Sequence, residues 1–63
     1  MEKGTIKFYN SGKGYGFIYN EADGRDYFFA GSDCIIPVHS GDKVTFEKGT
    51  GKRGPIAKTV QLL

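Results

Sequence analysis

The sequence predicts an all-β protein, a small closed or nearly closed barrel of five short strands, on three observations. Runs of β-branched and aromatic residues are short and are separated by turn residues such as Asn-Ser-Gly and Asp-Gly. No stretch shows the apolar period of an amphipathic helix. The chain has 63 residues and one cysteine, so we expect a single domain, 1–63, held by a compact sheet core and tight turns without a disulfide. Closing the sheet removes the strand edges that would otherwise promote aggregation.

The first strand is expected over residues 4–9, which are rich in β-branched and aromatic side chains. Ile6 points inward there, and strict alternation sends Phe8 inward as well. A bulge near Asn10 would instead turn Phe8 outward, and the residues alone leave both alternatives open. A turn over residues 10–12 then leads into a hairpin.

The second strand, residues 14–19, carries the stretch Lys13-Gly14-Tyr15-Gly16-Phe17-Ile18. Tyr15 and Phe17 share one face, and the two glycines fall on the other, where glycine marks a close backbone approach or a sharp twist. Lys13 is placed to meet a phosphate while both rings stack on bases. Residues 13–17 match the start of an RNA-binding signature whose last aromatic is absent here. A tight turn that contains two glycines and two aromatics is the alternative interpretation.

The third strand, residues 26–30, follows the hairpin-turn signal Asp23-Gly24. Alternation sends Phe28 to one face and Tyr27 with Phe29 to the other. A core position for Phe28 is the alternative to an exposed one.

One long connection, residues 31–41, joins the third and fourth strands. Ser32-Asp33 is a possible cap for a single helical turn, whereas Pro37 and Gly41 exclude a long helix.

The fourth strand is expected over residues 43–48, with Val44 and Phe46 inward, and the fifth over residues 56–62. Between them, residues 49–55 are expected to form a mobile, basic, glycine-rich loop. The apolar residues of the fifth strand share one phase with Lys58, so either Lys58 snorkels or the strand is bulged.

Aromatic residues are the main functional signal. Seven of the nine lie in residues 8–9, 15–17 and 27–29, more than so small a core can hide. Exposed rings beside lysines suit single-stranded nucleic acid. The net charge is only +2, so charge alone would bind weakly at physiological salt, and stacking must contribute much of the affinity.

Other classes of function are disfavoured by composition. No apolar run approaches the roughly 20 residues that span a membrane, and no signal-peptide pattern opens the chain, so we expect a cytoplasmic protein. Cys34 and His39 provide two metal ligands at most, so neither a metal nor a cofactor is expected, and Cys34 is interpreted as a small buried apolar side chain. His39 has no evident catalytic partner, so we expect neither catalysis nor a small-molecule substrate.

Taken together, these stretches resemble the cold-shock domain family over Gly4 to Val60, nearly the whole chain. The resemblance implies a five-stranded antiparallel Greek-key β-barrel of the OB-fold type that binds single-stranded RNA and DNA. It depends on Gly4-Thr5-Ile6-Lys7-Phe8-Tyr9-Asn10, Lys13-Gly14-Tyr15-Gly16-Phe17-Ile18, Asp26-Tyr27-Phe28-Phe29, Gly41-Asp42-Lys43-Val44-Thr45-Phe46 and Gly54-Pro55-Ile56-Ala57 with Val60.

The resemblance also implies roles for individual residues, and it favours an outward Phe8. The implied stacking residues are Phe8, Tyr15, Phe17 and Phe28. Phosphate or polar contacts are implied for Lys7, Asn10, Lys13 and Arg53, and a base-edge hydrogen bond for Asp26. For Lys7, Lys13 and Arg53, an ordinary solvated charge is the alternative.

The chain departs from the family pattern in several places. Phe8 stands where Trp is common, and Ala30 and Gly31 stand where His and Phe are common. Tyr27 and Phe29 are larger than the usual β-branched residues, and the loop before position 41 is about four residues shorter. Each lost stacking contact removes roughly 1–3 kcal/mol, so we expect a weaker and shorter binding site. His39 either replaces part of the loss or is an exposed loop histidine.

The sequence thus predicts a passive binder of single-stranded RNA or DNA that opposes secondary structure, as an RNA chaperone does. We expect a monomer, with a strand-swapped dimer as the alternative. A β-barrel that binds protein through an eroded nucleic-acid surface is the second hypothesis. A third, the RRM fold, shares residues 13–17 but needs two helices that the sequence does not predict.

Overall fold

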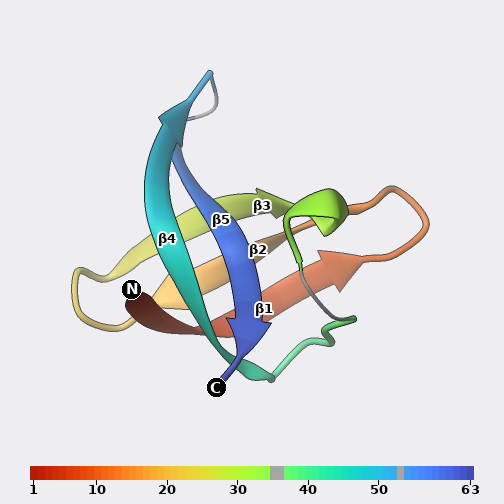
Figure 1. The fold of residues 1–63 in the computed structure, drawn as a ribbon, viewed down its shortest axis with the longest axis horizontal. Coiled ribbons are helices and arrows are strands. Elements are labelled where there is room, and N and C mark those ends of the chain that lie inside the picture. Colours follow the sequence, from red (N-terminus) through yellow and green to blue (C-terminus); the bar gives the residue numbers. More distant parts are fainter. Residues whose placement is uncertain (35–36, 53) are drawn as a thin grey trace.

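The computed structural model describes residues 1–34, 37–52 and 54–63, which form a closed barrel (Figure 1). Around the barrel the strand order is β1-β2-β3-β5-β4, and β4 pairs with β1 to close it. The series β4-β1-β2-β3 is the spatial order of a Greek key. The elements are β1 (Glu2–Asn10), β2 (Tyr15–Asn20), β3 (Arg25–Ala30), the short 3₁₀ helix η1 (Gly31–Asp33), β4 (Lys43–Gly51) and β5 (Gly54–Leu62).

The predicted five-stranded Greek-key barrel and the single helical turn are therefore confirmed. The predicted cap is wrong, because Ser32 and Asp33 lie inside η1, whose N-cap is Ala30 and has no side-chain cap hydrogen bond. One pairing differs from the predicted antiparallel sheet, because β3 and β5 run parallel where Phe28 meets Ile56. Cys34 and Val60 form a second parallel bridge just beyond it. β5 is thus antiparallel to β4 and, at these two contacts, parallel to the preceding part of the chain.

Among the described residues, the core is made by inward residues from all five strands, together with Val38 of the long connection. Tyr27 and Phe29 point inward as alternation predicts, and the Tyr27 ring packs against Phe46 with 5.2 Å between centroids. The fully or almost fully buried apolar side chains are Ile6, Ile18, Tyr27, Phe29, Val38, Val44, Phe46, Ala57 and Val60.

A bulge in β1 decides the orientation of Phe8. The register of β1 against β2 shifts between Ile6 and Phe8, so that Lys7 is the extra residue. Ile6 is buried and Phe8 is 42% exposed, which confirms the outward alternative. The bulge lies three residues before the predicted position near Asn10, at the point where the Ile6 backbone bonds to Gly41 and Asp42.

A second bulge breaks the alternation of the fifth strand. The register of β4 against β5 shifts between Thr45 and Glu47, and Thr59 has a φ of 53°. Ala57 and Val60 are both fully buried although they are three residues apart. The bulge alternative is therefore correct, and Lys58 is exposed without needing to snorkel.

The predicted loop over residues 49–55 is wrong for its described part. Gly49 pairs with Ile56 and Gly51 with Gly54, so β4 and β5 continue into a hairpin that projects from the barrel (Figure 1). A Cβ at Gly49 or Gly51 would lie 3.1 or 3.2 Å from the Ile56 side chain. The glycines therefore make room for Ile56 in a two-stranded ribbon. Arg53 lies outside the described residues.

Candidate nucleic-acid interface

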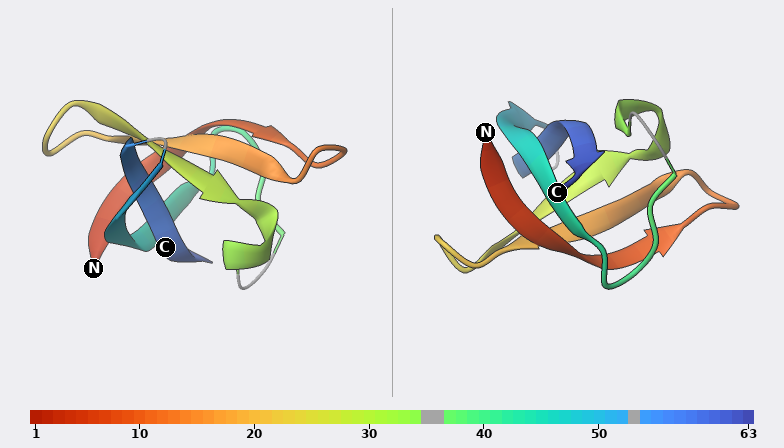
Figure 2. Two further views of the ribbon diagram at one scale, coloured as in Figure 1. Left: turned by 90° about the horizontal axis from the view of Figure 1, so that it is seen from above. Right: turned by 60° about the horizontal axis from the view of Figure 1, so that its bottom comes forward.

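Four aromatic rings form a continuous cluster on the outer face of the sheet made by β1, β2 and β3, the layer seen edge-on at the top of the left view in Figure 2. We call this cluster the aromatic surface. Tyr15 stacks on Phe28 with an interplanar angle of 21° and centroids 5.9 Å apart. Phe8 and Phe17 meet Tyr15 edge-on at 6.0 and 6.5 Å. Its members are Phe8, Tyr15, Phe17 and Phe28, the four residues predicted to stack on bases.

The alternation of β2 explains why these rings stay outside. Gly16 and Ile18 are buried, whereas Tyr15 and Phe17 are half-buried on the opposite face. A Cβ at Gly16 would overlap the carbonyl oxygen of Phe8 and lie 2.8 Å from the Phe29 ring. The close backbone approach predicted from the glycines is thus confirmed at Gly16.

Asn10 shapes the turn that carries Lys13. The Asn10 side-chain oxygen accepts a hydrogen bond from the Lys13 N–H at 3.0 Å, and its carbonyl oxygen accepts one from Gly14 at 2.7 Å. Gly14 takes a φ of 72°, which favours glycine. Lys13 is exposed beside the aromatic surface and forms no ion pair within the described part of the chain. The structure gives Asn10 a role in the turn, and its contact with nucleic acid stays a prediction.

Lys7 and Asp26 contact each other. The Lys7 ammonium lies 2.9 Å from the Asp26 carboxylate, and the two side chains are 60% and 40% exposed. Lys7 is on β1 and Asp26 on β3, so the pair crosses over β2, which lies between them. Exposed ion pairs of this kind contribute about 0–1 kcal/mol. A phosphate can therefore compete for Lys7 at small cost.

A shallow pocket of about 520 Å³ lies beside the aromatic surface and is lined by Lys13, Tyr15, Phe17, Phe28 and others. Ala30, which is part of this lining, stands where the family pattern has His. The small side chain leaves the pocket open on this side, next to the rings.

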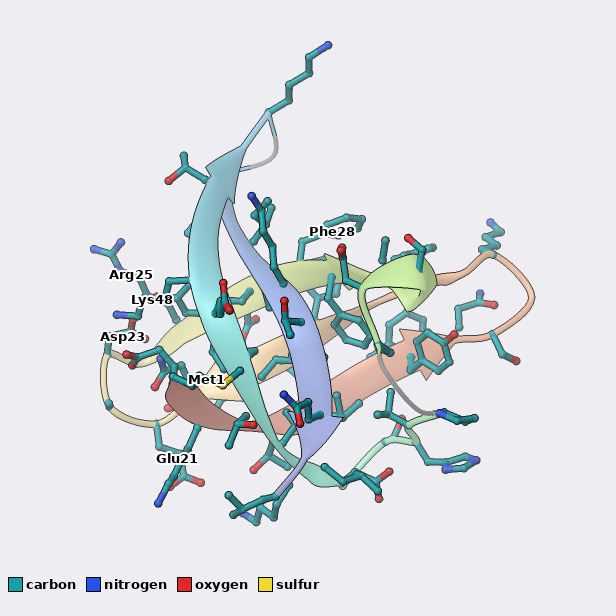
Figure 3. All side chains as sticks on the ribbon, viewed as in Figure 1. Met1, Glu21, Asp23, Arg25, Phe28 and Lys48 are labelled. Carbon is teal, nitrogen blue, oxygen red and sulfur yellow. The ribbon has the colours of Figure 1, made fainter. Side chains whose placement is uncertain are left out.

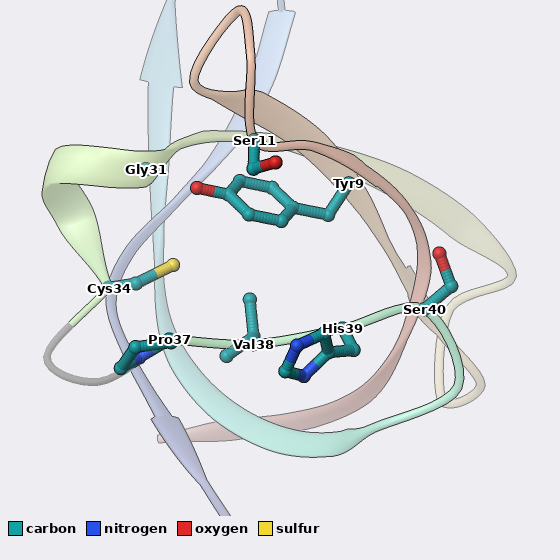
Figure 4. Close-up of a pocket in the computed structure, with 8 residues that line it drawn as sticks. All are labelled: Tyr9, Ser11, Gly31, Cys34, Pro37, Val38, His39 and Ser40. Atoms are coloured by element: carbon teal, nitrogen blue, oxygen red, sulfur yellow. The ribbon is translucent and has the colours of Figure 1, made fainter.

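Gly31 is required by its neighbour Tyr9. A Cβ at Gly31 would lie 2.7 Å from the Tyr9 hydroxyl oxygen, and the Tyr9 hydroxyl points toward Gly31 (Figure 4). The Gly31 N–H donates to the Gly14 carbonyl at 2.7 Å. The Tyr9 ring itself is fixed by stacking on Phe29, with centroids 5.6 Å apart. An aromatic side chain at position 31 is therefore incompatible with Tyr9 as it stands.

A separate pocket of about 530 Å³ opens next to Gly31 (Figure 4). Cys34, part of its lining, is half-buried and packs against the core, so it is less buried than predicted. Burial raises the pKa of the Cys34 thiol, and nearby Asp33 raises it further. The pocket is lined by Tyr9, Ser11, Gly31, Cys34, Pro37, Val38, His39 and Ser40.

His39 does not belong to the aromatic surface. Its side chain is 84% exposed, and its Nδ1 lies 3.8 Å from the Asp42 carboxylate. This placement supports the interpretation of an exposed loop histidine.

One aromatic residue on the same face is not among the predicted site residues. Tyr19 is 39% exposed and follows Phe17 by two positions on β2, so it points to the same side. The alternation Tyr15, Phe17, Tyr19 is visible in the sequence and could have indicated it.

Within the described residues, no helix is long and apolar enough to cross a membrane. The same part of the chain contains no group of three His, Cys, Asp or Glu residues that could hold a metal ion.

The chain is similar to known proteins both in sequence and in structure. Residues 2–63 match the family model of the 'Cold-shock' DNA-binding domain. The chain is 44% identical to cold shock protein 1 of Lactiplantibacillus plantarum, over 95% of this chain and 96% of that protein. It is 43% identical to cold shock protein CspC of Bacillus subtilis, over 97% of both chains. The structure resembles Drosophila Unr CSD456, with a TM-score of 0.81, 22% identity, and coverage of 98% of this chain and 26% of that chain. The match over residues 2–63 and these identities show that the chain belongs to the cold-shock domain family.

Proposed function

We propose that this protein binds single-stranded RNA or DNA on the aromatic surface and so opposes the formation of secondary structure. The observation that carries the proposal is the contiguity of the four rings on one exposed sheet face, with Lys13 at its edge. Every unpaired base has two π-faces that can stack on such rings, whereas the bases of a duplex already stack on each other.

Basic residues supply the backbone contacts. Lys13 has no competing carboxylate within the described residues, and Lys7 becomes available when its pair with Asp26 opens. Each phosphate contact makes the logarithm of the binding constant fall with the logarithm of salt, with a slope of about −0.7 per contact for single strands. A contact from Arg53 stays a prediction. We also propose a modest preference for pyrimidines, which arises from stacking geometry and not from base readout.

The family match and the intact aromatic row favour this function over the protein-interaction barrel. We further propose that the protein has no catalytic activity and acts as a monomer. The monomer is favoured because every strand of the closed barrel already has a neighbour on both sides. A strand-swapped dimer would be detected by light scattering after size exclusion. The predicted cytoplasmic localisation stays a prediction.

The test is a titration with fluorescent oligo-dT and oligo-U at two salt concentrations, with intrinsic tyrosine emission recorded in parallel. We expect saturable, salt-sensitive binding that quenches tyrosine emission. Phe17→Ala should weaken it by roughly 1–3 kcal/mol, whereas Leu62→Ala, an exposed site on β5, should bind like the wild type. Absence of binding at low salt would overturn the proposal.

A further inference from the structure

Tyr19 extends the aromatic row of β2 beyond the aromatic surface. Tyr15 and Phe17 have centroids 6.5 Å apart, and Tyr19 continues the same outward series one step further along the strand. Ile18 and Asn20, its neighbours in sequence, are fully buried, so its ring cannot turn inward. The row of outward rings on β2 therefore has three members.

The Tyr19 side chain serves no evident structural purpose. Within the described part of the chain its ring meets no other aromatic ring, and its hydroxyl has no hydrogen-bond partner. By contrast, Tyr27 uses its hydroxyl to donate to Asp23 and its ring to pack on Phe46. Tyr19 has neither kind of contact and is 39% exposed, so the outer side of its ring is available to a ligand.

Charged groups frame the ring on both sides. Tyr19 lies in register with Thr5 on β1 and with Asp26 on β3. The Lys43 ammonium donates to the Thr5 hydroxyl at 3.0 Å, and Lys7 pairs with Asp26 at 2.9 Å. Two lysines thus contact the residues that flank Tyr19, and their ion pairs, Lys7 with Asp26 and Lys43 with Glu21 at 3.8 Å, are exposed and open at small cost.

We infer that Tyr19 forms a further base-stacking subsite, with phosphates contacted by Lys7 and Lys43. The inference rests on the proposed function and extends it. Stacking is absent at the Ala30 and Gly31 end of the site and gained at the opposite end of β2. The bound nucleic acid is therefore shifted toward the β2–β3 turn, and the binding site is not simply shortened.

The test compares the wild type with Tyr19→Thr and Tyr19→Phe on an oligo-dT series that grows by one nucleotide at a time. Threonine keeps the β-propensity of the strand while removing the ring. We expect Tyr19→Thr to bind short oligonucleotides like the wild type and to stop gaining affinity one nucleotide earlier. At full length it should lose about five- to tenfold, the lower part of the range for one stacked base. Tyr19→Phe should bind like the wild type.

Two controls separate this inference from the proposed function. Leu62→Thr removes an equally exposed apolar side chain from β5 and should not change the length at which affinity stops rising. Phe17→Ala should weaken binding at every length. If Phe17→Ala weakens binding and Tyr19→Thr matches the wild type, the Tyr19 subsite is refuted and the proposed function stands. If no oligonucleotide binds the wild type, the proposed function itself fails.

Photo-cross-linking provides a direct measurement. A 5-iodouracil placed at each position of the oligonucleotide in turn should cross-link to Tyr19 from one terminal position and to Tyr15 or Phe17 from internal ones. Loss of affinity in Tyr19→Thr that is equal at all lengths, or cross-links that never reach Tyr19, would overturn the subsite.

Discussion

The contact between Gly31 and Tyr9 explains why this chain lacks an aromatic residue at position 31, and it can be tested by a double-mutant cycle. Gly31→Ala places a methyl group 2.7 Å from the Tyr9 hydroxyl oxygen, closer than real Cβ contacts come. Because the Tyr9 ring stacks on Phe29, it cannot easily move away from the new methyl group. Overpacking of this kind costs about 1–3 kcal/mol, and in a domain of this size each kcal/mol lowers the Tm by about 4–8 °C.

Tyr9→Phe should relieve the conflict completely. Once the hydroxyl is gone, the nearest atom to the new Cβ is the Gly14 carbonyl oxygen at 3.5 Å, an ordinary van der Waals contact. Gly31 has no positive φ, so alanine fits its backbone and also lowers the entropy of the unfolded chain. The double variant should therefore be as stable as Tyr9→Phe alone, or about 0.4–1 kcal/mol more stable.

The free energy of unfolding of the four proteins, from urea titrations followed by circular dichroism, gives the coupling energy between positions 9 and 31. We expect a favourable coupling of about 1–3 kcal/mol. The reasoning would be refuted if Gly31→Ala were as stable as the wild type, or if Tyr9→Phe did not rescue it.

Three further predictions concern the sheet that carries the site. Gly16→Ala should prevent folding or cost more than about 4 kcal/mol, because its Cβ would overlap a β1 carbonyl oxygen; a cooperative wild-type-like melt would contradict this. The Tyr27 hydroxyl bond lowers the pKa of Asp23, so its stabilising effect is present above about pH 4 and is lost as pH falls further. Tyr27→Phe should flatten that pH dependence in thermal melts, and an unchanged profile would count against the bond. Lys7→Gln should make the salt slope of oligo-dT binding shallower by about 0.7, because one phosphate contact is lost; an unchanged slope would mean that Lys7, which pairs with Asp26 in the free protein, makes no contact with the nucleic-acid backbone.

The polar group around Asp23 also shows how the chain accommodates Tyr27. The ring fills the core beside Phe46, and the hydroxyl emerges at the β2–β3 turn, where Asp23 accepts its hydrogen bond. Lys48 lies 3.5 Å from the same carboxylate (Figure 3). A β-branched residue at this position would leave this carboxylate without its hydroxyl donor. Both parts of the large Tyr27 side chain thus have a partner, the hydroxyl at the rim of the barrel and the ring in its core.

Much of the fold and site was predictable because it depends on local rules. The period-two alternation places Tyr15 and Phe17 outward and Tyr27 and Phe29 inward, whatever the rest of the chain does. The turns are also local: the backbone carbonyls of Asn10 and Asn20 each accept a hydrogen bond from a glycine four residues later. The position of all five strands followed from the same patterns, although β1, β4 and β5 extend further than predicted.

What only the tertiary structure decided involves contacts between residues far apart in the chain. The bulge at Lys7 forms where the Ile6 backbone bonds to Gly41 and Asp42, and no local pattern places it there. The parallel contact of β3 with β5 and the ion pair of Lys7 with Asp26 depend equally on how distant strands meet.

The same distinction applies to glycine. Gly31 and Gly49 have no special backbone φ, so nothing local requires glycine at either position. Space is limited by side chains of other residues, by Tyr9 at Gly31 and by Ile56 and Lys58, each at 3.1 Å, at Gly49. A sequence shows that a side chain is missing, and only the packed structure shows which atom occupies the space, because that depends on how the strands close around the core.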